Sequence, residues 1–181
     1  MIDRDLITRS QEGDIGAFNE MVRDLTPVAW RIAFRILTDN FAAEDIAQEV
    51  MVKLWRKLDR FNSDRCFSSW FYRIVVNCCY DELRRRKREI VSVTDERSWQ
   101  ILSEITRGDN GLELSVDDYE LLLKVAVEKL SPKQKVVFVL SELEGMERRE
   151  IMKITGMNGS SLKSNLHYAR KKIKELIKGR Y

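Results

Sequence analysis

The feature that most restricts the fold of this chain is its shortage of helix-breaking residues. Its 181 residues include only 8 glycines and 2 prolines, about half of what average usage would give for this length. Hydrophobic residues make up 44% of the chain and charged residues 34%. This combination favours helices with one buried face over many short strands joined by turns. We therefore expect an all-α fold with a packed core.

Apolar residues recur at helical spacing through the first half of the chain. One row runs through residues 18–25, with Asp14 as its expected N-cap. Thr26-Pro27 predicts a new helix start, because proline is favoured at the first helical position. We expect about four helices in this half, the later ones carrying the apolar rows of residues 28–37, 46–58 and 71–83.

Two helix starts are expected in the second half. Ser115–Asp118 and Ser131–Gln134 both have the pattern of a capping box. The apolar run Val136–Leu140 has the composition of a strand, but the strong helix start just before it favours a buried helix, which Gly145 ends.

The last segment has the pattern of a helix-turn-helix. A short helix over residues 149–155 is followed by a turn at Gly156, an expected cap at Asn158 and a long helix whose apolar row begins at Leu162. Away from that row lie hydrogen-bonding side chains and then cations: Ser161, Ser164, Asn165, His167, Tyr168, Lys171 and Lys172. Short polar groups suit base edges and cations suit phosphates. The alternative is an ordinary solvated helix face.

The charge distribution divides the chain into three parts. Residues 1–88 hold 16 Lys/Arg against 14 Asp/Glu (net +2), residues 89–118 hold 2 against 8 (net −6), and residues 119–181 hold 14 against 7 (net +7). We expect two small helical domains, 1–88 and 115–181, joined by a flexible acidic linker over 89–114. Five consecutive cations, Arg84–Arg88, end the first domain and suit either a solvated helix end or phosphate contacts.

Several classes of function are disfavoured. The three cysteines, Cys66, Cys78 and Cys79, form no metal-binding or disulfide pattern, and the chain has one histidine. No carboxylate pair, phosphate-binding loop or nucleophile–base set indicates an enzyme, and we expect no metal or cofactor. No apolar stretch is long enough to span a membrane, and the N-terminus lacks the order of a signal peptide. We expect a cytoplasmic protein with no membrane insertion.

Several segments resemble those of bacterial sigma factors. Ala43–Trp55 resembles their polymerase-binding helix, and Phe67–Asn77 with the Arg84–Arg88 run is similar to the helix that opens and reads the −10 promoter element. Leu130–Gln134 and Ser161–Arg170 are similar to parts of the domain that reads the −35 element. The order and size match the extracytoplasmic-function (ECF) group, which keeps only these two domains.

The resemblance implies a transcription initiation factor whose partners are core RNA polymerase and promoter DNA. It assigns polymerase binding to Asp45, Gln48 and Glu49. It assigns −10 recognition to Asn62, Ser63, Phe67, Trp70, Arg73, Asn77, Arg84 and Arg85. It assigns −35 recognition to Ser161, Lys163, Ser164, His167, Tyr168, Arg170 and Lys171. An anti-sigma partner is also implied, which in this group is often tethered to the membrane.

Some alternatives stay open at this stage. Phe67 and Trp70 suit a pocket for an extruded base, but they also suit the core. A helix-turn-helix repressor or activator that works without polymerase accounts for residues 130–181, but it leaves the likeness at Ala43–Trp55 without a role. A helical adaptor or anti-sigma-like protein is expected to ignore promoter DNA even when polymerase is present.

Overall fold

The computed structural model describes residues 2–89 and 127–178, and every regular element in these ranges is a helix. This confirms the all-α fold class for the described part of the chain. An N-terminal group contains α1 (Arg4–Gln11), α2 (Ile15–Leu37), α3 (Asn40–Leu58) and α4 (Phe67–Glu89). A C-terminal group contains α7 (Pro132–Phe138), the π-helical turn η2 (Val139–Leu143), α8 (Arg148–Thr155) and α9 (Gly159–Lys178).

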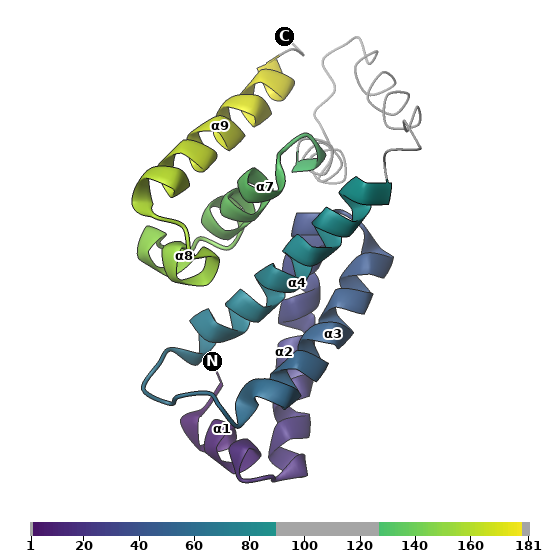
Figure 1. Cartoon of the computed structure of the whole chain (residues 1–181), viewed down its shortest axis with the longest axis vertical. Helices are drawn as coiled ribbons and strands as arrows, with labels where there is room; N and C mark the ends of the chain where they lie inside the picture. The colour runs from purple at the N-terminus through teal and green to yellow at the C-terminus, as the bar shows by residue number, and fades with distance from the viewer. Residues whose placement is uncertain (1, 90–126, 179–181) are drawn as a thin grey trace, which may run out of the picture.

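The N-terminal group is a helical bundle in which α2, α3 and α4 pack against one another (Figure 1). Their apolar rows meet in one core, where the largest fully buried side chains include Met21, Ile32, Ile36, Val50, Leu54, Phe71 and Val75. Cys78 and Cys79 are buried in the same core as small apolar residues.

The helix start expected at Thr26-Pro27 is wrong, because α2 continues through both residues as one helix of 23 residues. The Thr26 hydroxyl donates to the carbonyl oxygen of Val22 at 2.7 Å and does not cap a new helix. Proline in a helix interior costs about 3 kcal/mol. An uninterrupted buried row, from Met21 through Ala29 to Ile36, offsets that cost because each fully buried large side chain contributes about 1.5–3 kcal/mol.

The helix α1 was not expected from the sequence, since it has only eight residues and no extended apolar row. It is stabilised by tertiary contacts with α2 and with the end of α3. Leu6 and Ile7 are buried, and the Gln11 side-chain amide donates to the carbonyl oxygens of Leu58 and Phe61 at 2.8 and 2.9 Å.

The C-terminal group confirms most of the local signals read from the sequence. Ser131 and Gln134 form the expected capping box at the start of α7, and Asn158 accepts a hydrogen bond from the Ser161 amide at the start of α9. Gly156 ends α8 with φ +71°, a conformation in which glycine avoids the strain of a Cβ atom. The π-helical turn after Phe138 was not expected.

The two groups of helices touch along α4. The helix α8 packs against α4, while α7 and η2 make further contacts with α4 and α2 (Figure 1). Val137, Leu140 and Ile151 of the C-terminal group belong to the same buried cluster as the N-terminal core. The expected linker, apart from Glu89, and the expected helix start at Ser115 lie outside the described residues. None of the described helices is both long and apolar enough to cross a membrane.

Candidate functional site

The polymerase-binding residues expected from the sequence share one exposed face of α3. Asp45, Gln48 and Glu49 all point away from the buried row of Ile46 and Val50. Glu49 forms an ion pair with Lys53, one turn further along, at 2.7 Å. Asp45 and Gln48 form no hydrogen bond or ion pair with the part of the chain that the structure describes. The face is therefore acidic, and two of its three polar side chains have no partner among the described residues.

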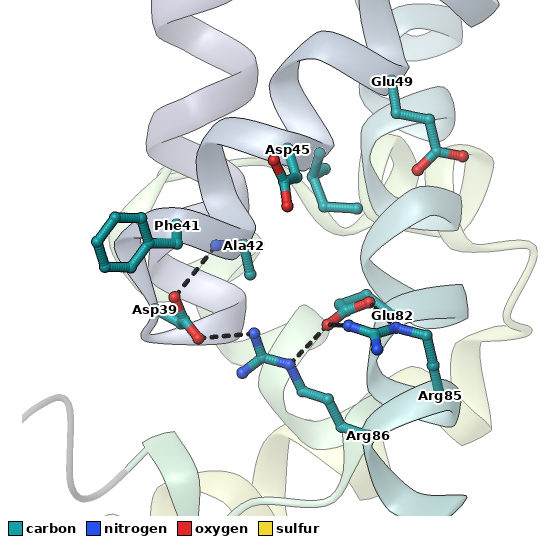
Figure 2. A pocket seen from close by; sticks show the side chains of 9 residues that line it. Asp39, Phe41, Ala42, Asp45, Glu49, Glu82, Arg85 and Arg86 are labelled. Carbon is teal, nitrogen blue, oxygen red and sulfur yellow. Dashed lines mark hydrogen bonds and ion pairs between the residues drawn. The ribbon is translucent and has the colours of Figure 1, made fainter. Parts of the chain in front are cut away.

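A shallow cavity of about 410 Å³ opens between the start of α3 and the end of α4 (Figure 2). Asp45 and Glu49 line it from α3, and Glu82 and Arg86 line it from α4. At its floor, Arg86 donates to Asp39 at 2.9 Å and to Glu82 at 2.8 Å. The Ala42 amide and Arg86 together hold the pKa of Asp39 below its usual range. The floor is thus an organised ion-pair network, whereas the carboxylates of Asp45 and Glu49 at the rim face solvent.

Apolar side chains extend this face of α3, and sequence analysis missed them. Phe41, Val52 and Trp55 are 81%, 50% and 49% exposed. Together with Asp45 and Gln48 they step along the helix by 4, 3, 4 and 3 residues, which aligns them in one seam. The signal was present in the sequence, because this seam is out of phase with the buried row. Exposed apolar side chains in such a seam are typical of a surface that binds another helix.

The loop expected to hold the −10 strand precedes α4. Asn62 and Ser63 are exposed in it. The Asn62 side chain accepts from the Asp64 amide at 2.8 Å, and the Ser63 carbonyl oxygen accepts from Arg4 at 3.3 Å. Cys66 lies directly before α4, where hydrogen bonds from Ser69 lower the pKa of its thiol. The loop is thus held at both ends with its polar groups facing solvent.

The aromatic residues at the start of α4 form part of a cluster. The rings of Phe67 and Trp70 lie 5.4 and 4.8 Å from that of Phe61, and 5.7 Å from each other. Both side chains are half-buried. The core interpretation therefore accounts for part of each side chain, and the rest is exposed to solvent near the loop.

The remaining −10 residues differ in their surroundings. Arg73 and Asn77 are exposed one turn apart on α4 and form no hydrogen bond with the described residues. Arg84 pairs with Asp81 at 3.2 Å, and Arg85 pairs with Glu82 at 2.8 Å. A DNA phosphate that reached either cation would compete with a carboxylate on the same helix.

The long helix α9 brings together most of the residues expected to contact −35 DNA. Four of them follow its exposed face from the first turn onward: Lys163, Ser164, His167 and Tyr168. The His167 and Tyr168 rings meet edge to face at 5.6 Å. Lys171 continues this face and lies 3.8 Å from Glu175. The opposite side of α9 is buried through Leu162, Leu166, Ala169 and Ile173.

Two of the expected −35 residues take part in side-chain hydrogen bonds within the protein. The Ser161 carbonyl oxygen accepts a hydrogen bond from the Asn165 side chain at 2.8 Å. Arg170 donates to Glu142 of η2 at 2.8 Å, although its side chain is 56% exposed. The side chains of the other five form no such hydrogen bond with the described residues.

Two family models match the two groups of helices. Residues 21–89 match sigma-70 region 2, which spans most of α2 and all of α3 and α4. Residues 120–173 match sigma-70 region 4, which spans α7, η2, α8 and most of α9. The chain belongs to the sigma factors of the ECF group. As a sigma factor, it directs RNA polymerase to promoters.

Relatives of this sigma factor match along nearly its whole length. The ECF sigma factor SigW of Bacillus subtilis is 26% identical over 183 residues, covering 98% of each chain. The ECF sigma-E factor of Escherichia coli K12 is 29% identical over 181 residues, covering 96% of this chain and 93% of the relative.

Two solved structures share the fold. CnrH, solved in complex with the cytosolic domain of CnrY, aligns with a TM-score of 0.70 and 23% identity over 99% of both chains. RpoE from Bartonella quintana, solved with the anti-sigma factor NepR, aligns with a TM-score of 0.65 and 24% identity over 91% of this chain and 98% of that one.

Proposed function

We propose that this sigma factor holds core polymerase with the exposed face of α3. The observation that carries the proposal is the state of Asp45 and Gln48, which are exposed and unpaired among the described residues. A helix that needed these side chains for its own stability would bury or pair them. They are available instead to cationic and polar side chains of a partner, which gives orientation and specificity to docking. Phe41, Val52 and Trp55 add apolar contact area along the same seam.

The −10 element is read by the loop at residues 62–66 and by α4. Capturing an extruded base offsets an unstacking cost of about a few kcal/mol, and this requires an aromatic or apolar wall and hydrogen-bonding groups. The accessible sides of Phe67 and Trp70 supply the wall, while Asn62, Arg73 and Asn77 supply polar contacts. Ser63, Arg84 and Arg85 lie where they can contact the DNA backbone.

The −35 element is read by α9. Ser164, His167 and Tyr168 contact base edges from the first half of the helix, whereas Lys171, one turn further on, contacts phosphate. Ser161 and Lys163 flank the base-reading group. Arg170 contacts the DNA backbone once its guanidinium leaves Glu142.

Residues 1–88 and 115–181 act as two domains joined by residues 89–114, without catalytic chemistry of their own. They act in the cytoplasm, where polymerase and promoters meet. By analogy with the solved complex of the sigma factor RpoE with the anti-sigma factor NepR, an anti-sigma protein opposes them.

Run-off transcription with core polymerase on a library of promoter sequences tests this function. We compare the wild type with the triple variant Asp45→Ala, Gln48→Ala, Glu49→Ala, and with Asp24→Ala, an exposed carboxylate on α2, as the matched control. The triple variant should keep its helicity and melting temperature, as exposed positions do, and lose polymerase binding and transcription.

Three outcomes contradict the proposal. Retained polymerase binding by the folded triple variant removes the α3 assignment. Tight duplex binding by a dimer without polymerase indicates a repressor or activator. Indifference to promoter DNA in the presence of polymerase indicates an adaptor.

A further inference from the structure

The loop at residues 62–66 begins just after α3 ends, and the side chain of Gln11 in α1 lies at that joint. Its amide nitrogen Nε2 donates to the carbonyl oxygen of Leu58 at 2.8 Å and to that of Phe61 at 2.9 Å. Leu58 is the last residue of α3, so its carbonyl oxygen is one of those that the helix itself leaves unpaired. Gln11 therefore closes a helix end and fixes the residue that leads into the loop.

The chain between α3 and α4 is shaped by two successive turns. The Phe61 amide donates to the Leu58 carbonyl oxygen at 3.0 Å, and the Arg65 amide donates to the Asn62 carbonyl oxygen at 3.0 Å. Such bonds close each turn over four residues, but they do not orient the turns relative to the helical bundle. Gln11 bonds both ends of the first turn from another helix, and it thereby sets the direction in which the loop leaves the bundle.

A second residue of α1 contacts the loop itself. The Arg4 guanidinium donates through Nη2 to the Ser63 carbonyl oxygen at 3.3 Å. Arg4 is the first residue of α1 and Gln11 is the last, so the two lie about 10 Å apart along the helix axis, at roughly 1.5 Å per residue. The helix thus holds the chain both where it enters the loop and within the loop.

The position of α1 is itself fixed by contacts with the bundle. A helix of eight residues is not stable by itself in water. Leu6 and Ile7 are buried, and α1 packs against α2. Arg9 pairs with Asp14, the N-cap of α2, at 2.6 Å. Because α1 is anchored in this way, the hydrogen bonds from Gln11 and Arg4 join the loop to a rigid part of the molecule.

The joint that Gln11 fixes also carries the aromatic platform of the proposed −10 reader. Phe61 is 7% exposed, and its ring contacts those of Phe67 and Trp70. A shift of the Phe61 backbone would move the ring on which the other two pack. The polar loop and the aromatic wall therefore depend on the same two hydrogen bonds.

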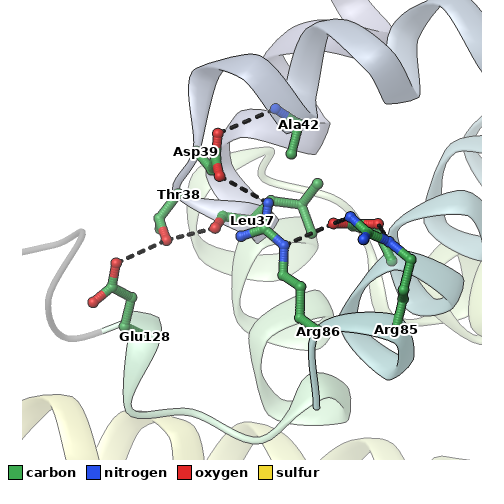
Figure 3. Close-up of polar contacts among 8 residues, drawn as sticks. Leu37, Thr38, Asp39, Ala42, Arg85, Arg86 and Glu128 are labelled. Atoms are coloured by element: carbon green, nitrogen blue, oxygen red, sulfur yellow. Dashed lines mark hydrogen bonds and ion pairs between the residues drawn. The ribbon is translucent and has the colours of Figure 1, made fainter. Parts of the chain in front are cut away.

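The start of α3 is held in a different way. Asp39, its N-cap, accepts from the Ala42 amide at 3.1 Å and from Arg86 at 2.9 Å (Figure 3). Arg86 also pairs with Glu82 at 2.8 Å. This network joins the start of α3 to the end of α4, and none of its four residues belongs to the loop or to the aromatic cluster. The contacts from α1 thus act on the proposed −10 reader, whereas a separate network holds the start of the proposed polymerase-binding helix.

We propose that α1 is a positioning element for −10 recognition, in which Gln11, together with Arg4, holds residues 62–66 in the conformation that receives the extruded base. The inference rests on the proposed −10 reading, because Gln11 acts through the loop and is a positioning residue. A loop that is ordered before DNA arrives loses less freedom on binding. The apparent affinity for the strand rises with the fraction of molecules whose loop has the binding conformation.

The first experiment measures the loop in the free, full-length protein. The backbone order parameters of the Asp64 and Arg65 amides should be about 0.8 in the wild type and fall below about 0.6 in Gln11→Ala. Gln11→Glu keeps the size of the side chain and replaces the donor by an acceptor, so it should loosen the loop as much at neutral pH. The control is Ser10→Ala, which removes a buried hydroxyl that donates to the Leu6 carbonyl oxygen within α1. It should lower the melting temperature and keep the order parameters of the wild type.

The second experiment measures recognition by the holoenzyme formed from core polymerase and the full chain. Promoters carry a randomised −10 element, and permanganate reactivity of thymines reports opening. Gln11→Ala and Gln11→Glu should lower opening at the preferred sequence by about tenfold, as expected for the loss of two hydrogen bonds. They should also reduce the preference for one base at the extruded position, because a mobile loop adjusts to other bases. Ser10→Ala should keep that preference.

Two further measurements separate positioning from a general loss of structure. Affinity for core polymerase and for a duplex that carries only the −35 element should stay within about twofold of the wild type in both Gln11 variants. Arg4→Ala, at an exposed position, removes the second contact with little effect on folding. It should weaken the base preference by about twofold, and it tests the proposal even if the Gln11 variants lose helicity by circular dichroism.

The outcomes separate the role of α1 from the proposed function. Equal order parameters in the wild type and both Gln11 variants overturn the proposal, as does a mobile loop with unchanged opening and base preference. An equal loss of preference in Ser10→Ala also overturns it, because the stability of α1 would then be the cause. If the wild-type holoenzyme opens none of the promoters, the proposed function fails, and the order parameters still decide whether Gln11 fixes the loop.

Discussion

Arg170 on the DNA-facing helix α9 donates a hydrogen bond to the carboxylate of Glu142 in η2 at 2.8 Å. This bond and the guanidinium charge hold the pKa of Glu142 below its usual range, so the carboxylate is charged at neutral pH. A DNA phosphate therefore competes with Glu142 for Arg170. Exposed pairs of this kind contribute only about 0.2–1 kcal/mol, so the competition is one that phosphate can win.

We predict that Glu142→Gln strengthens binding to duplex DNA carrying a −35 element, because Arg170 is released before DNA arrives. The affinity should rise by a few-fold, and the slope of log affinity against log salt should steepen by up to about one. Titrations at four salt concentrations measure both. Glu147→Gln is the control, and an unchanged slope with Glu142→Gln would show that Arg170 makes no phosphate contact.

Base-reading and phosphate-binding positions on α9 should respond differently to alanine. Ser164→Ala or His167→Ala should cost about 1–3 kcal/mol at one promoter and change which −35 base is preferred. Lys171→Ala should weaken binding at all promoters alike and lower the salt slope by about one. Selection from a randomised −35 library measures preference. If His167→Ala and Ser164→Ala leave the preference as it was, the base-reading face lies elsewhere.

On α4, the predicted −10 residues should divide into structural and DNA-contacting ones. Trp70→Ala removes a ring packed against Phe61 and Phe67 and should lower the free energy of unfolding by about 2–4 kcal/mol, somewhat less than a fully buried aromatic would. Asn77→Ala, at an exposed position, should leave stability within about 0.5 kcal/mol and impair promoter opening. Permanganate reactivity of unpaired thymines measures opening, and a gel shift at low temperature measures closed binding. Normal opening by Asn77→Ala refutes its assignment.

Trp55 should contribute more to polymerase binding than to the stability of the fold. Its ring meets Phe18 edge to face at 4.6 Å while the residue stays 49% exposed, so Trp55→Ala should cost only about 1 kcal/mol of stability. Affinity for core polymerase should fall by about tenfold if the seam on α3 is the docking surface. Ile15→Ala removes an exposed apolar residue outside the seam and is the control. Equal affinities for the two variants would confine docking to the polar residues.

The N-cap of α3 should make part of the stability depend on acid. The pKa of Asp39 is lowered in the folded protein, first by the Ala42 amide and then by Arg86, so the folded state binds this proton more weakly than the unfolded state does. The stabilisation is present above about pH 4, near the ordinary aspartate pKa, and is lost as pH falls through the folded-state pKa. In Asp39→Asn, which keeps a capping oxygen, the fall in stability below pH 4 should be shallower. Urea unfolding between pH 2 and 7 measures how the free energy of unfolding depends on pH, with Asp24→Asn as the reference.

Local signals in the sequence were sufficient wherever a few neighbouring residues decide the structure. The caps at Asp14, Ser131 and Asn158 and the left-handed turn at Gly156 follow from side chains and conformations within one turn. The apolar rows predicted most of the helices for the same reason. They also placed the exposed face of α3, because polar residues out of phase with a buried row must face outward.

Other features were decided by contacts between distant parts of the chain. Thr26-Pro27 has the local pattern of a helix start, but burial on both sides of it keeps α2 continuous. The short helix α1 exists because Gln11 and its neighbours pack on α2 and the end of α3.

The sequence by itself determined most of the helices and caps, the family and the residue types on each exposed face, since these depend on spacing within a few turns. Only the tertiary structure decided that Glu144 meets Arg31 and Arg35, and that Arg170 is held by Glu142. Nothing in local spacing marks one glutamate among many as the partner of an arginine 113 residues away. That choice depends on how the packed helices exclude water from one carboxylate and leave the others exposed.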